Sequence, residues 1–473
     1  TRVKADVVTN DAFRKNLGIG LEDYISGELP VDVIYRSPVG SSSEAIVNGD
    51  ITPASITIDE LMYQKSPGTE GGQFAFNARF VDGQIRQIRE LTLASNDFKM
   101  DNGQLSFIQK NNESVLSAGE IQSVFLQEND IARLAFEITP EDVLKLKING
   151  KFLDGRWFLQ NQEKEEEDDD DLPQAKIISL DFERVRTDPA RLIENVKMYI
   201  EINKDSRITQ LETDARAGEG DIYLRYKPAE NGEKIFRLEV DDAGAALKAF
   251  ALYDNMDGGE LTIFAEPLTT ADEGDFSGRL VLRDFRVRKA PVLAKLISAL
   301  SLPGLAQLFD NEGVRFSRLE SRFEWLFQEK GPKIEIKDGR TSGNSLGLTF
   351  EGFINQATSR VDVNGTIVPV SGINTLMSNI PLLGDVIAGR KGEGIFAATY
   401  TVKGDMAEPK VSVNALAALA PGFLRTILFQ DDKDETDFIP PEGDVDEDDL
   451  ETPDNVDLEK VPPENVPENQ NAE

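Results

Sequence analysis

Histidine and cysteine are both absent from this chain of 473 residues. Without cysteine, the chain has no disulfide framework, no thiolate zinc site and no thiol nucleophile. Without histidine, it has no imidazole general base and no Ser-His-Asp triad. Carboxylate oxygens remain as candidate metal ligands, but no pair of acids stands out as catalytic. We therefore predict no catalytic residues, no metal, no cofactor and no enzymatic activity.

A long hydrophobic run is also missing. No stretch of 18 consecutive apolar residues and no signal peptide is present in the sequence. Because the chain begins with Thr1 rather than Met, we interpret it as a fragment or a processed chain. A targeting segment, if the protein has one, is then missing from this sequence.

Basic residues are few, with 51 Lys and Arg against 85 Asp and Glu and a net charge of −34. Residues 163–171 hold eight acids and one base, and residues 430–473 hold eighteen acids and two bases. Nucleic acid is not an expected partner, because neutralising phosphates requires a basic surface. We interpret residues 161–175 as an acidic surface loop or linker and residues 431–473 as a disordered acidic tail.

Short β-prone runs separated by Gly, Asn, Asp or Pro, residues 156–160 among them, fill most of the remaining sequence, which predicts a mainly β protein. In residues 74–80, Phe74, Phe76 and Phe80 alternate with Ala75, Asn77 and Arg79. This period of two is typical of an antiparallel strand with one apolar face. Residues 81–84 are expected to form a tight turn, because Asp-Gly tolerates positive φ.

Helices are expected at a few places only. Residues 11–17 are predicted to form a helix capped by Asn10 or Asp11. Asp188 and Pro189 are interpreted as the start of a second helix carrying Leu192, Val196 and Tyr199. The other expected helices are residues 243–253, with Leu247, Phe250 and Ala251 as the apolar stripe, and the apolar segments 291–309, 372–388 and 414–429.

Three segments carry a resemblance to a known family. They read DDAGAALKAFALYDNMDGGELTI (241–263), GRLVLRDFRVRKAPVLAKLISALSLPGLAQLFDNEGVRFSRLESRF (278–323) and GTIVPVSGINTLMSNIPLLGDVIAGRKGEGIFAATYTVKGDMAEPKVSVNALAALAPGFLR (365–425). Together they resemble the C-terminal region of AsmA-like bacterial envelope proteins of the YhdP type. The resemblance spans residues 176–430 in all, more loosely before residue 241, and residues 1–160 fit it only as a β-rich segment.

This resemblance implies a long antiparallel β-sheet that curls into a groove, with short apolar helices at its C-terminal end. It also implies a periplasmic protein tethered to the inner membrane, which carries phospholipid toward the outer membrane. The partners are then phospholipid acyl chains, the inner membrane through an upstream anchor, and the outer membrane or an envelope protein at the C-terminal end. The alternative is a TamB-like scaffold that assembles outer-membrane or surface proteins.

The apolar strand faces supply the candidate groove lining. An alternating face of this kind fits either a lipid groove or the closed core of an ordinary sandwich, and the resemblance favours the groove. The candidate lining residues are Phe74, Phe76, Phe80, Leu280, Leu282 and Phe350. A basic cluster around the strand that contains Leu280 and Leu282 has three interpretations: a contact for phosphate head groups, a solvated strand face, or pairing with Asp284. Its members are Arg279, Arg283, Arg286, Arg288 and Lys289.

The last apolar segment, residues 414–429, has almost no polar face. Exposed apolar surface of this kind usually marks an interaction site, and the scarcity of basic residues disfavours simple adsorption to anionic lipid. We expect this segment to contact a partner or a membrane, whereas the alternative is a cap on the end of the sheet. The candidate contact residues are Leu416, Leu419, Phe423, Leu424, Ile427 and Leu428.

The double substitution Leu419→Asp with Phe423→Asp separates these two interpretations. If the segment docks to a partner, two carboxylates on its apolar surface should abolish transport while the strands remain folded. Circular dichroism checks the fold, and an envelope-permeability assay checks function. Unchanged envelope function in the double variant identifies the segment as a cap.

Overall fold

The computed structural model describes residues 2–16, 23–38, 42–69, 71–110, 113–156, 158, 175–228, 234–268, 275–299, 313–328, 331–369 and 397–414. Internal contacts divide the chain into one unit, Thr1–Leu428, and a second, Phe429–Glu473. All the described residues belong to the first unit. The expected apolar segment 372–388, the acidic tail and the six candidate contact residues after 414 lie outside them.

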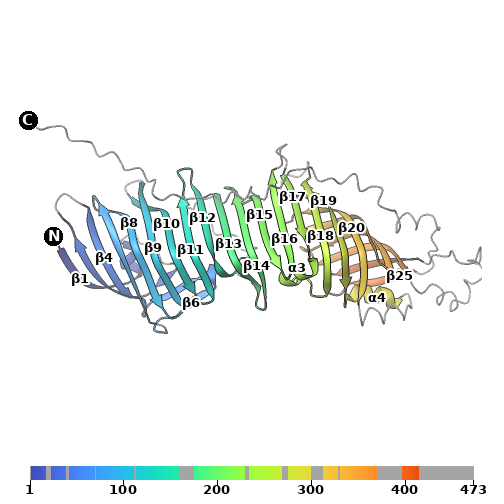
Figure 1. Cartoon of the computed structure of the whole chain (residues 1–473), viewed down its shortest axis with the longest axis horizontal. Coiled ribbons are helices and arrows are strands. Elements are labelled where there is room, and N and C mark those ends of the chain that lie inside the picture. Colours follow the sequence, from blue (N-terminus) through green and yellow to red (C-terminus); the bar gives the residue numbers. More distant parts are fainter. Residues whose placement is uncertain are drawn as a thin grey trace, which may run out of the picture. The chain divides into compact units, whose positions relative to one another are not determined.

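Antiparallel strands make up most of the described chain, as the sequence predicts (Figure 1). The principal strands are β1 (Arg2–Thr9), β3 (Leu29–Arg36), β4 (Ser43–Asp50), β7 (Gly72–Val81), β8 (Gln84–Ser95), β9 (Phe98–Lys110), β10 (Glu113–Leu126), β11 (Asn129–Ile138), β12 (Val143–Asp154), β13 (Ala175–Asp188), β14 (Arg191–Ile202), β15 (Ile208–Ala217), β16 (Gly220–Pro228), β17 (Lys234–Val240), β18 (Met256–Pro267), β19 (Phe276–Val287), β20 (Val314–Leu326), β21 (Lys333–Ser342), β22 (Leu346–Asn355), β23 (Arg360–Pro369), β24 (Ala398–Asp405) and β25 (Lys410–Asn414).

These strands form one sheet of 22 strands. The pairings run from β1 to β3, β4, β7, β8, β9 and β10, and from β10 onward each strand pairs with the next one in the chain. Among the described strands, every pair in this sheet is antiparallel except β12 and β13, which run parallel. The sheet is not strongly curled, unlike the curled sheet that the family resemblance implies.

Smaller elements lie against this sheet. Figure 1 shows β6, α3 and α4 near the same ends of the strands, at the bottom of the view. Within the described part of the chain, no helix has the length and apolar character needed to cross a membrane. These elements are α1 (Asp11–Asn16), η1 (Asp59–Leu61), α3 (Ala243–Ala249), α4 (Pro291–Ala299), and a second sheet made of β2 (Ile25–Ser26), β5 (Ser55–Ile58) and β6 (Tyr63–Lys65).

Two local predictions are confirmed by the backbone. Asp82 and Gly83 have φ of 54° and 81° and close the hairpin in which Val81 pairs with Gln84, as a two-residue turn of two left-handed residues requires. Helix α1 begins after Asn10, whose side-chain oxygen accepts a hydrogen bond from the Phe13 amide at 2.9 Å. That contact satisfies one of the free donors at the helix start.

The helix expected after Asp188 is wrong, because these residues form β14. Asn195 has a φ of 51°, and the β14–β15 register shifts between Glu194 and Lys197. The kink turns Ile193 and Val196, three residues apart, toward the same side, where both are buried. A spacing of three between buried residues imitates a helix, so the kink explains the error.

Two further expectations fail in detail. In α3 the small residues Ala243, Gly244, Ala246 and Ala249 are buried, whereas Phe250 is exposed. A Cβ on Gly244 would lie 2.6 Å from the carbonyl oxygen of Met256, so the helix packs through its small residues at close range rather than through Phe250. The strand expected over residues 156–160 also fails, since the described residues there, Arg156 and Phe158, are helical.

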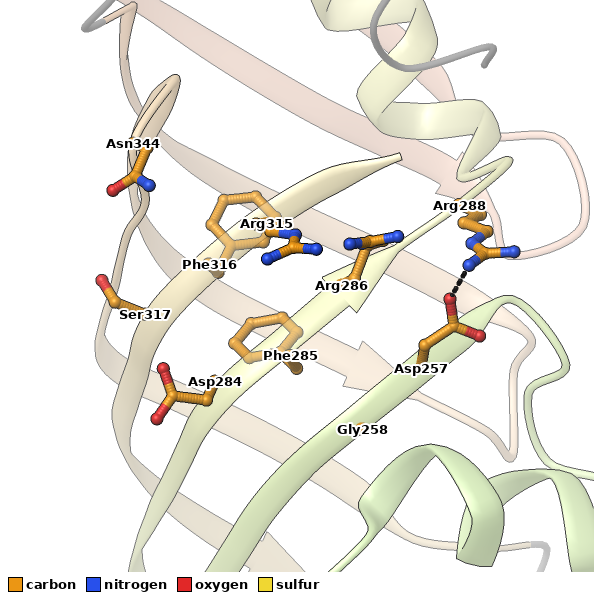
Figure 2. A pocket seen from close by; sticks show the side chains of 10 residues that line it. All are labelled: Asp257, Gly258, Asp284, Phe285, Arg286, Arg288, Arg315, Phe316, Ser317 and Asn344. Carbon is orange, nitrogen blue, oxygen red and sulfur yellow. Dashed lines mark ion pairs between the residues drawn. The ribbon is translucent and has the colours of Figure 1, made fainter. Parts of the chain in front are cut away.

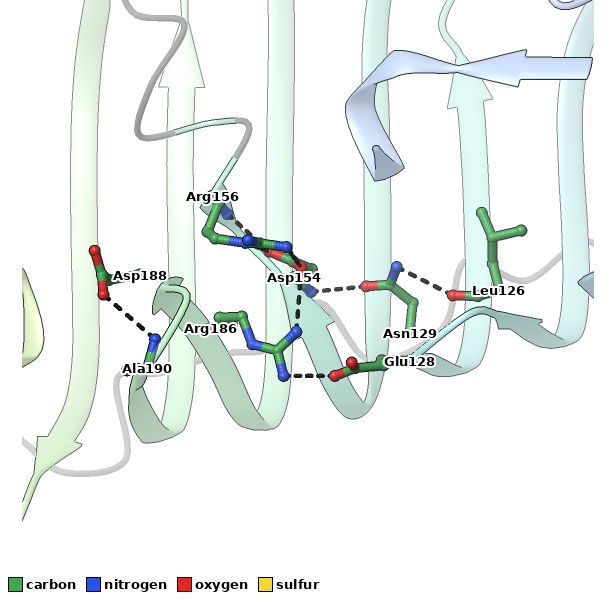
Figure 3. A network of polar contacts seen from close by, with 8 residues as sticks. All are labelled: Leu126, Glu128, Asn129, Asp154, Arg156, Arg186, Asp188 and Ala190. Carbon is green, nitrogen blue, oxygen red and sulfur yellow. Dashed lines mark hydrogen bonds and ion pairs between the residues drawn. The ribbon is translucent and has the colours of Figure 1, made fainter. Parts of the chain in front are cut away.

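The parallel β12–β13 pair is held at one end by a buried carboxylate. The side chain of Asp154 is 9% exposed and forms ion pairs with Arg156 at 2.6 Å and Arg186 at 3.4 Å. The Asp154 amide donates to the side-chain oxygen of Asn129 at 2.7 Å, and the Asn129 amide group donates to the Leu126 carbonyl at 3.2 Å (Figure 3). The network therefore connects β10, β11, β12 and β13.

Burial alone would raise the pKa of Asp154, but hydrogen bonds from Arg156 and the charges of Arg156 and Arg186 outweigh it and lower that pKa. A carboxyl group whose pKa is lower in the folded state stabilises the fold above its unfolded pKa of about 3.9. This contribution is lost as the pH falls through the lower, folded pKa.

We predict that Asp154→Ala lowers the free energy of unfolding by about 2 to 4 kcal/mol at pH 7, because Arg156 loses its carboxylate partner and Arg186 keeps only Glu128. Urea denaturation measures this loss, and the difference between variant and parent should shrink as the pH falls below about 4. Glu120→Gln is the matched control, because the Glu120–Arg133 pair joins β10 and β11 with the Arg133 side chain 40% exposed. Glu120→Gln should lower the free energy of unfolding by about 1 kcal/mol or less. Equal losses in the two variants would contradict the stabilising role that we assign to Asp154.

Candidate functional site

One face of the 22-stranded sheet is apolar along its whole series of strands, and we call it the apolar face. Strand pairing aligns its residues: Leu224 pairs with Leu238, Leu238 with Ile263, and Ile263 with Leu280. Because side chains alternate along a strand, aligned residues lie on the same side of a sheet. The apolar face therefore arises from alternation within strands and from register between them.

The opposite face is charged. Its side chains form ion pairs between neighbouring strands, including Arg225 with Glu212 at 3.5 Å and Arg340 with Glu320 at 3.0 Å. Burial would raise the pKa of Glu320, but hydrogen bonds and charges from Arg340 and Arg279 lower it. The sheet thus separates charge from apolar surface across its thickness.

All six candidate lining residues lie on the apolar face. Phe74 and Phe76 stack with their ring centroids 6.3 Å apart, and Phe80 packs edge-on against Tyr35. Leu280 is partly buried and Leu282 is buried at 7% exposure, both against the cluster beneath α4. Phe350 covers Gly339 on the neighbouring strand, where an added Cβ would overlap its ring.

Part of the apolar face is covered, and we call this part the covered band. β5 and β6 contribute Ile56 and Tyr63 to one buried cluster. α3 contributes Ala246 and Ala249 to a second, and α4 contributes Leu296 and further residues to a third. The sheet residues of these clusters are mostly less than 9% exposed. Side chains thus fill this band as they fill an ordinary protein core.

The rest of the apolar face is half-buried, and we call it the open band. On β17, Val240 is 5% exposed in the covered band, whereas Leu238 on the same face is only half-buried. A second layer of structure would bury such residues, as α3 and α4 do nearby. The open band comprises Val33, Val47, Phe76, Ile88, Leu105, Ile121, Leu134, Ile148, Leu180, Ile200, Leu211, Leu224, Leu238, Ile263, Leu280, Leu319, Ile336, Leu348, Val363 and Val411.

Aromatic side chains gather beyond the open band on β16 to β20. Phe276 lies 5.8 Å from Tyr226, 6.4 Å from Phe236 and 6.4 Å from Phe327 between ring centroids. Phe327 stacks on Trp325 at 5.7 Å, and the indole nitrogen of Trp325 is buried without a hydrogen-bond partner in the described structure. Aromatic groups with a polar atom suit a boundary between apolar and polar surroundings.

None of the six candidate lining residues lies on β14 to β17. Ile200 follows the segment after Asp188 that the sequence predicts to be helical. Leu211, Leu224 and Leu238 follow the alternation that identifies Phe74 and Phe76, so the same pattern was sufficient to find them. No pattern in the sequence distinguishes the open band from the covered band, because both are apolar and alternate.

Among the residues that the structure describes, two arginines of the basic cluster form ion pairs with acids other than Asp284. Arg279 pairs with Glu320 and Arg288 pairs with Asp257. In the described part of the chain, acidic residues nowhere gather in threes as a metal site needs.

Comparison with known proteins gives no match to a family model, to a curated protein or to a solved structure.

The absence of cysteine allows the open band to be probed with single introduced thiols. We predict that Leu238→Cys reacts with a maleimide in the native state, because its position is half-buried and uncovered. Val240→Cys, two residues away on the same face, should remain protected until denaturant is added, because α3 covers it. Mass spectrometry over time measures both rates, and equal protection at the two positions would show that the open band is covered.

Proposed function

We propose that this protein carries phospholipid between membranes, with acyl chains held along the open band. The observation that supports this most is the continuity of half-buried apolar side chains across nearly every strand of one sheet. An isolated apolar patch would suggest a protein contact. Because the open band continues from strand to strand, an acyl chain can make similar apolar contacts at successive positions along the band.

The energetics of an acyl chain favour such a surface. Each methylene removed from water contributes about 0.8 kcal/mol, so the transfer of a lipid between membranes requires continuous apolar contact. No covalent bond is made or broken in this process. Lipid transfer therefore requires neither histidine nor cysteine. The charged opposite face keeps the other side of the sheet solvated.

The family resemblance supplies the setting of this proposal. An AsmA-like protein of the YhdP type would be periplasmic, anchored in the inner membrane by an upstream segment, with its C-terminal end toward the outer membrane. The groove of such a protein would correspond to the apolar face, with the aromatic groups around Phe276 and Trp325 at its margin. Phe74, Phe76, Phe80, Leu280, Leu282 and Phe350 would then be lipid contacts.

One observation favours the second candidate, a TamB-like scaffold for membrane-protein assembly. β1 pairs only with β3, so within the described structure its other edge carries unpaired backbone groups. Free sheet edges bind extended segments of other proteins by strand addition. Capture of barrel-assembly proteins without phospholipid would favour this function over lipid transport.

The substitution Leu238→Asp tests the lipid proposal on the full chain purified from membranes. A carboxylate in the open band opposes acyl-chain contact, so co-purified phospholipid should fall about tenfold, which corresponds to about 1.4 kcal/mol. Ile235→Asp is the matched control, because the side chain of Ile235 lies on the opposite face of the same strand. It should leave the phospholipid content unchanged, as measured by mass spectrometry of the extracted lipids.

A photo-crosslinking residue at Phe74 or Phe76 supplies the independent measurement. The expected product is a covalent phospholipid adduct at either position. Absence of co-purified phospholipid from the parent chain, together with absence of an adduct, would refute the lipid proposal.

A further inference from the structure

A cavity of about 530 Å³ lies where β18, β19 and β20 approach the start of α4. Three arginines and two aspartates line it, together with neutral residues (Figure 2). The backbone opens this space, since Asp284 has a φ of 50° and Gly258 a φ of 66° on adjacent strands. The charged and polar lining residues are Asp257, Asp284, Arg286, Arg288, Arg315, Ser317 and Asn344.

The arginines of the cavity are not equivalent. Arg288 pairs with Asp257, so these two charges offset each other. Arg286 and Arg315 lie directly opposite one another on β19 and β20, and Figure 2 shows their guanidinium groups approaching each other. Neither has an ion pair in the described structure. Like charges at opposed positions destabilise a sheet. Asp257 lies opposite Arg286 on β18, but its ion pair is with Arg288.

The geometry points to a binding site for a phosphate group between Arg286 and Arg315. Guanidinium groups match phosphate oxygens with paired hydrogen bonds, and two of them can hold one phosphate. A bound phosphate would also remove the repulsion between the two arginines. With Asp257 paired to Arg288, Asp284 is the other carboxylate that lines the cavity, and it would contact a cationic group attached to that phosphate.

This site is independent of the proposed lipid transport, because its chemistry requires only a phosphate. The phosphate could belong to a free ion or to the head group of a phospholipid. Asp284 distinguishes the two sources, since only a zwitterionic head group carries an amine for it to contact. The two sources are therefore separated by comparing inorganic phosphate with glycerophosphoethanolamine.

Isothermal titration of the full chain with each probe tests the site. The parent should bind inorganic phosphate, and Arg286→Gln with Arg315→Gln should weaken this binding at least about tenfold, because two charge-assisted contacts are lost. Arg283→Gln is the matched control, because Arg283 lies on β19 but does not line the cavity. This variant should bind inorganic phosphate as tightly as the parent does. If the parent binds glycerophosphoethanolamine more tightly than inorganic phosphate, and Asp284→Asn removes this difference, the natural ligand is a phospholipid head group. If the parent binds both probes equally, the natural ligand is a phosphate ion.

Thermal unfolding gives a second measurement that does not depend on heat signals. Phosphate should raise the melting temperature of the parent and of Arg283→Gln, but not that of the double variant. Without phosphate, the double variant should melt no lower than the parent, because its substitutions remove a repulsion. Failure of the parent to bind either probe, or full binding by the double variant, would overturn the site whatever the outcome of the lipid experiments.

Discussion

Register between neighbouring strands is the constraint on which this protein depends. The alternation of side chains makes each strand apolar on one side. These apolar sides form one continuous face across the 22 strands only if each strand pairs with its neighbour in the correct register. A slip of one residue in any pair would move apolar side chains to the charged face. The ion pairs on that face, such as Glu120 with Arg133 between β10 and β11, favour the same register. Each face therefore specifies the alignment that the other requires.

Several strands of the sheet are kinked within their length. Glu90, Asn102, Asn195 and Asp284 have positive φ inside β8, β9, β14 and β19. A residue of this kind redirects the strand and changes which side chains face inward. On β14 the kink at Asn195 lies between Ile193 and Val196, which are both buried, and Ile200 farther along the strand is half-buried. The short helices and the small sheet cover the buried clusters and leave the open band uncovered.

The sequence predicted the class of fold well, because alternation and turn chemistry are local. Asp82 and Gly83 identify their hairpin by composition alone, and Phe74, Phe76 and Phe80 identify one face of their strand. Asn195 could not be recognised in advance, since its left-handed φ depends on pairing with β15. Whether an apolar residue is covered depends on distant elements, which is why Leu238 and Val240 appear alike in the sequence. For the same reason, Arg286 and Arg315 could not be placed together, because no local pattern connects them.

The central claim is that an acyl chain occupies the open band and not the covered band. Methyl NMR of isotope-labelled isoleucine, with a phospholipid carrying a spin label on its acyl chain, measures this directly. The account predicts that the methyl signals of Ile200, Ile263 and Ile336 broaden strongly, whereas those of buried Ile193 and Ile222 do not. Equal broadening at all five positions, or no broadening at any of them, would contradict it.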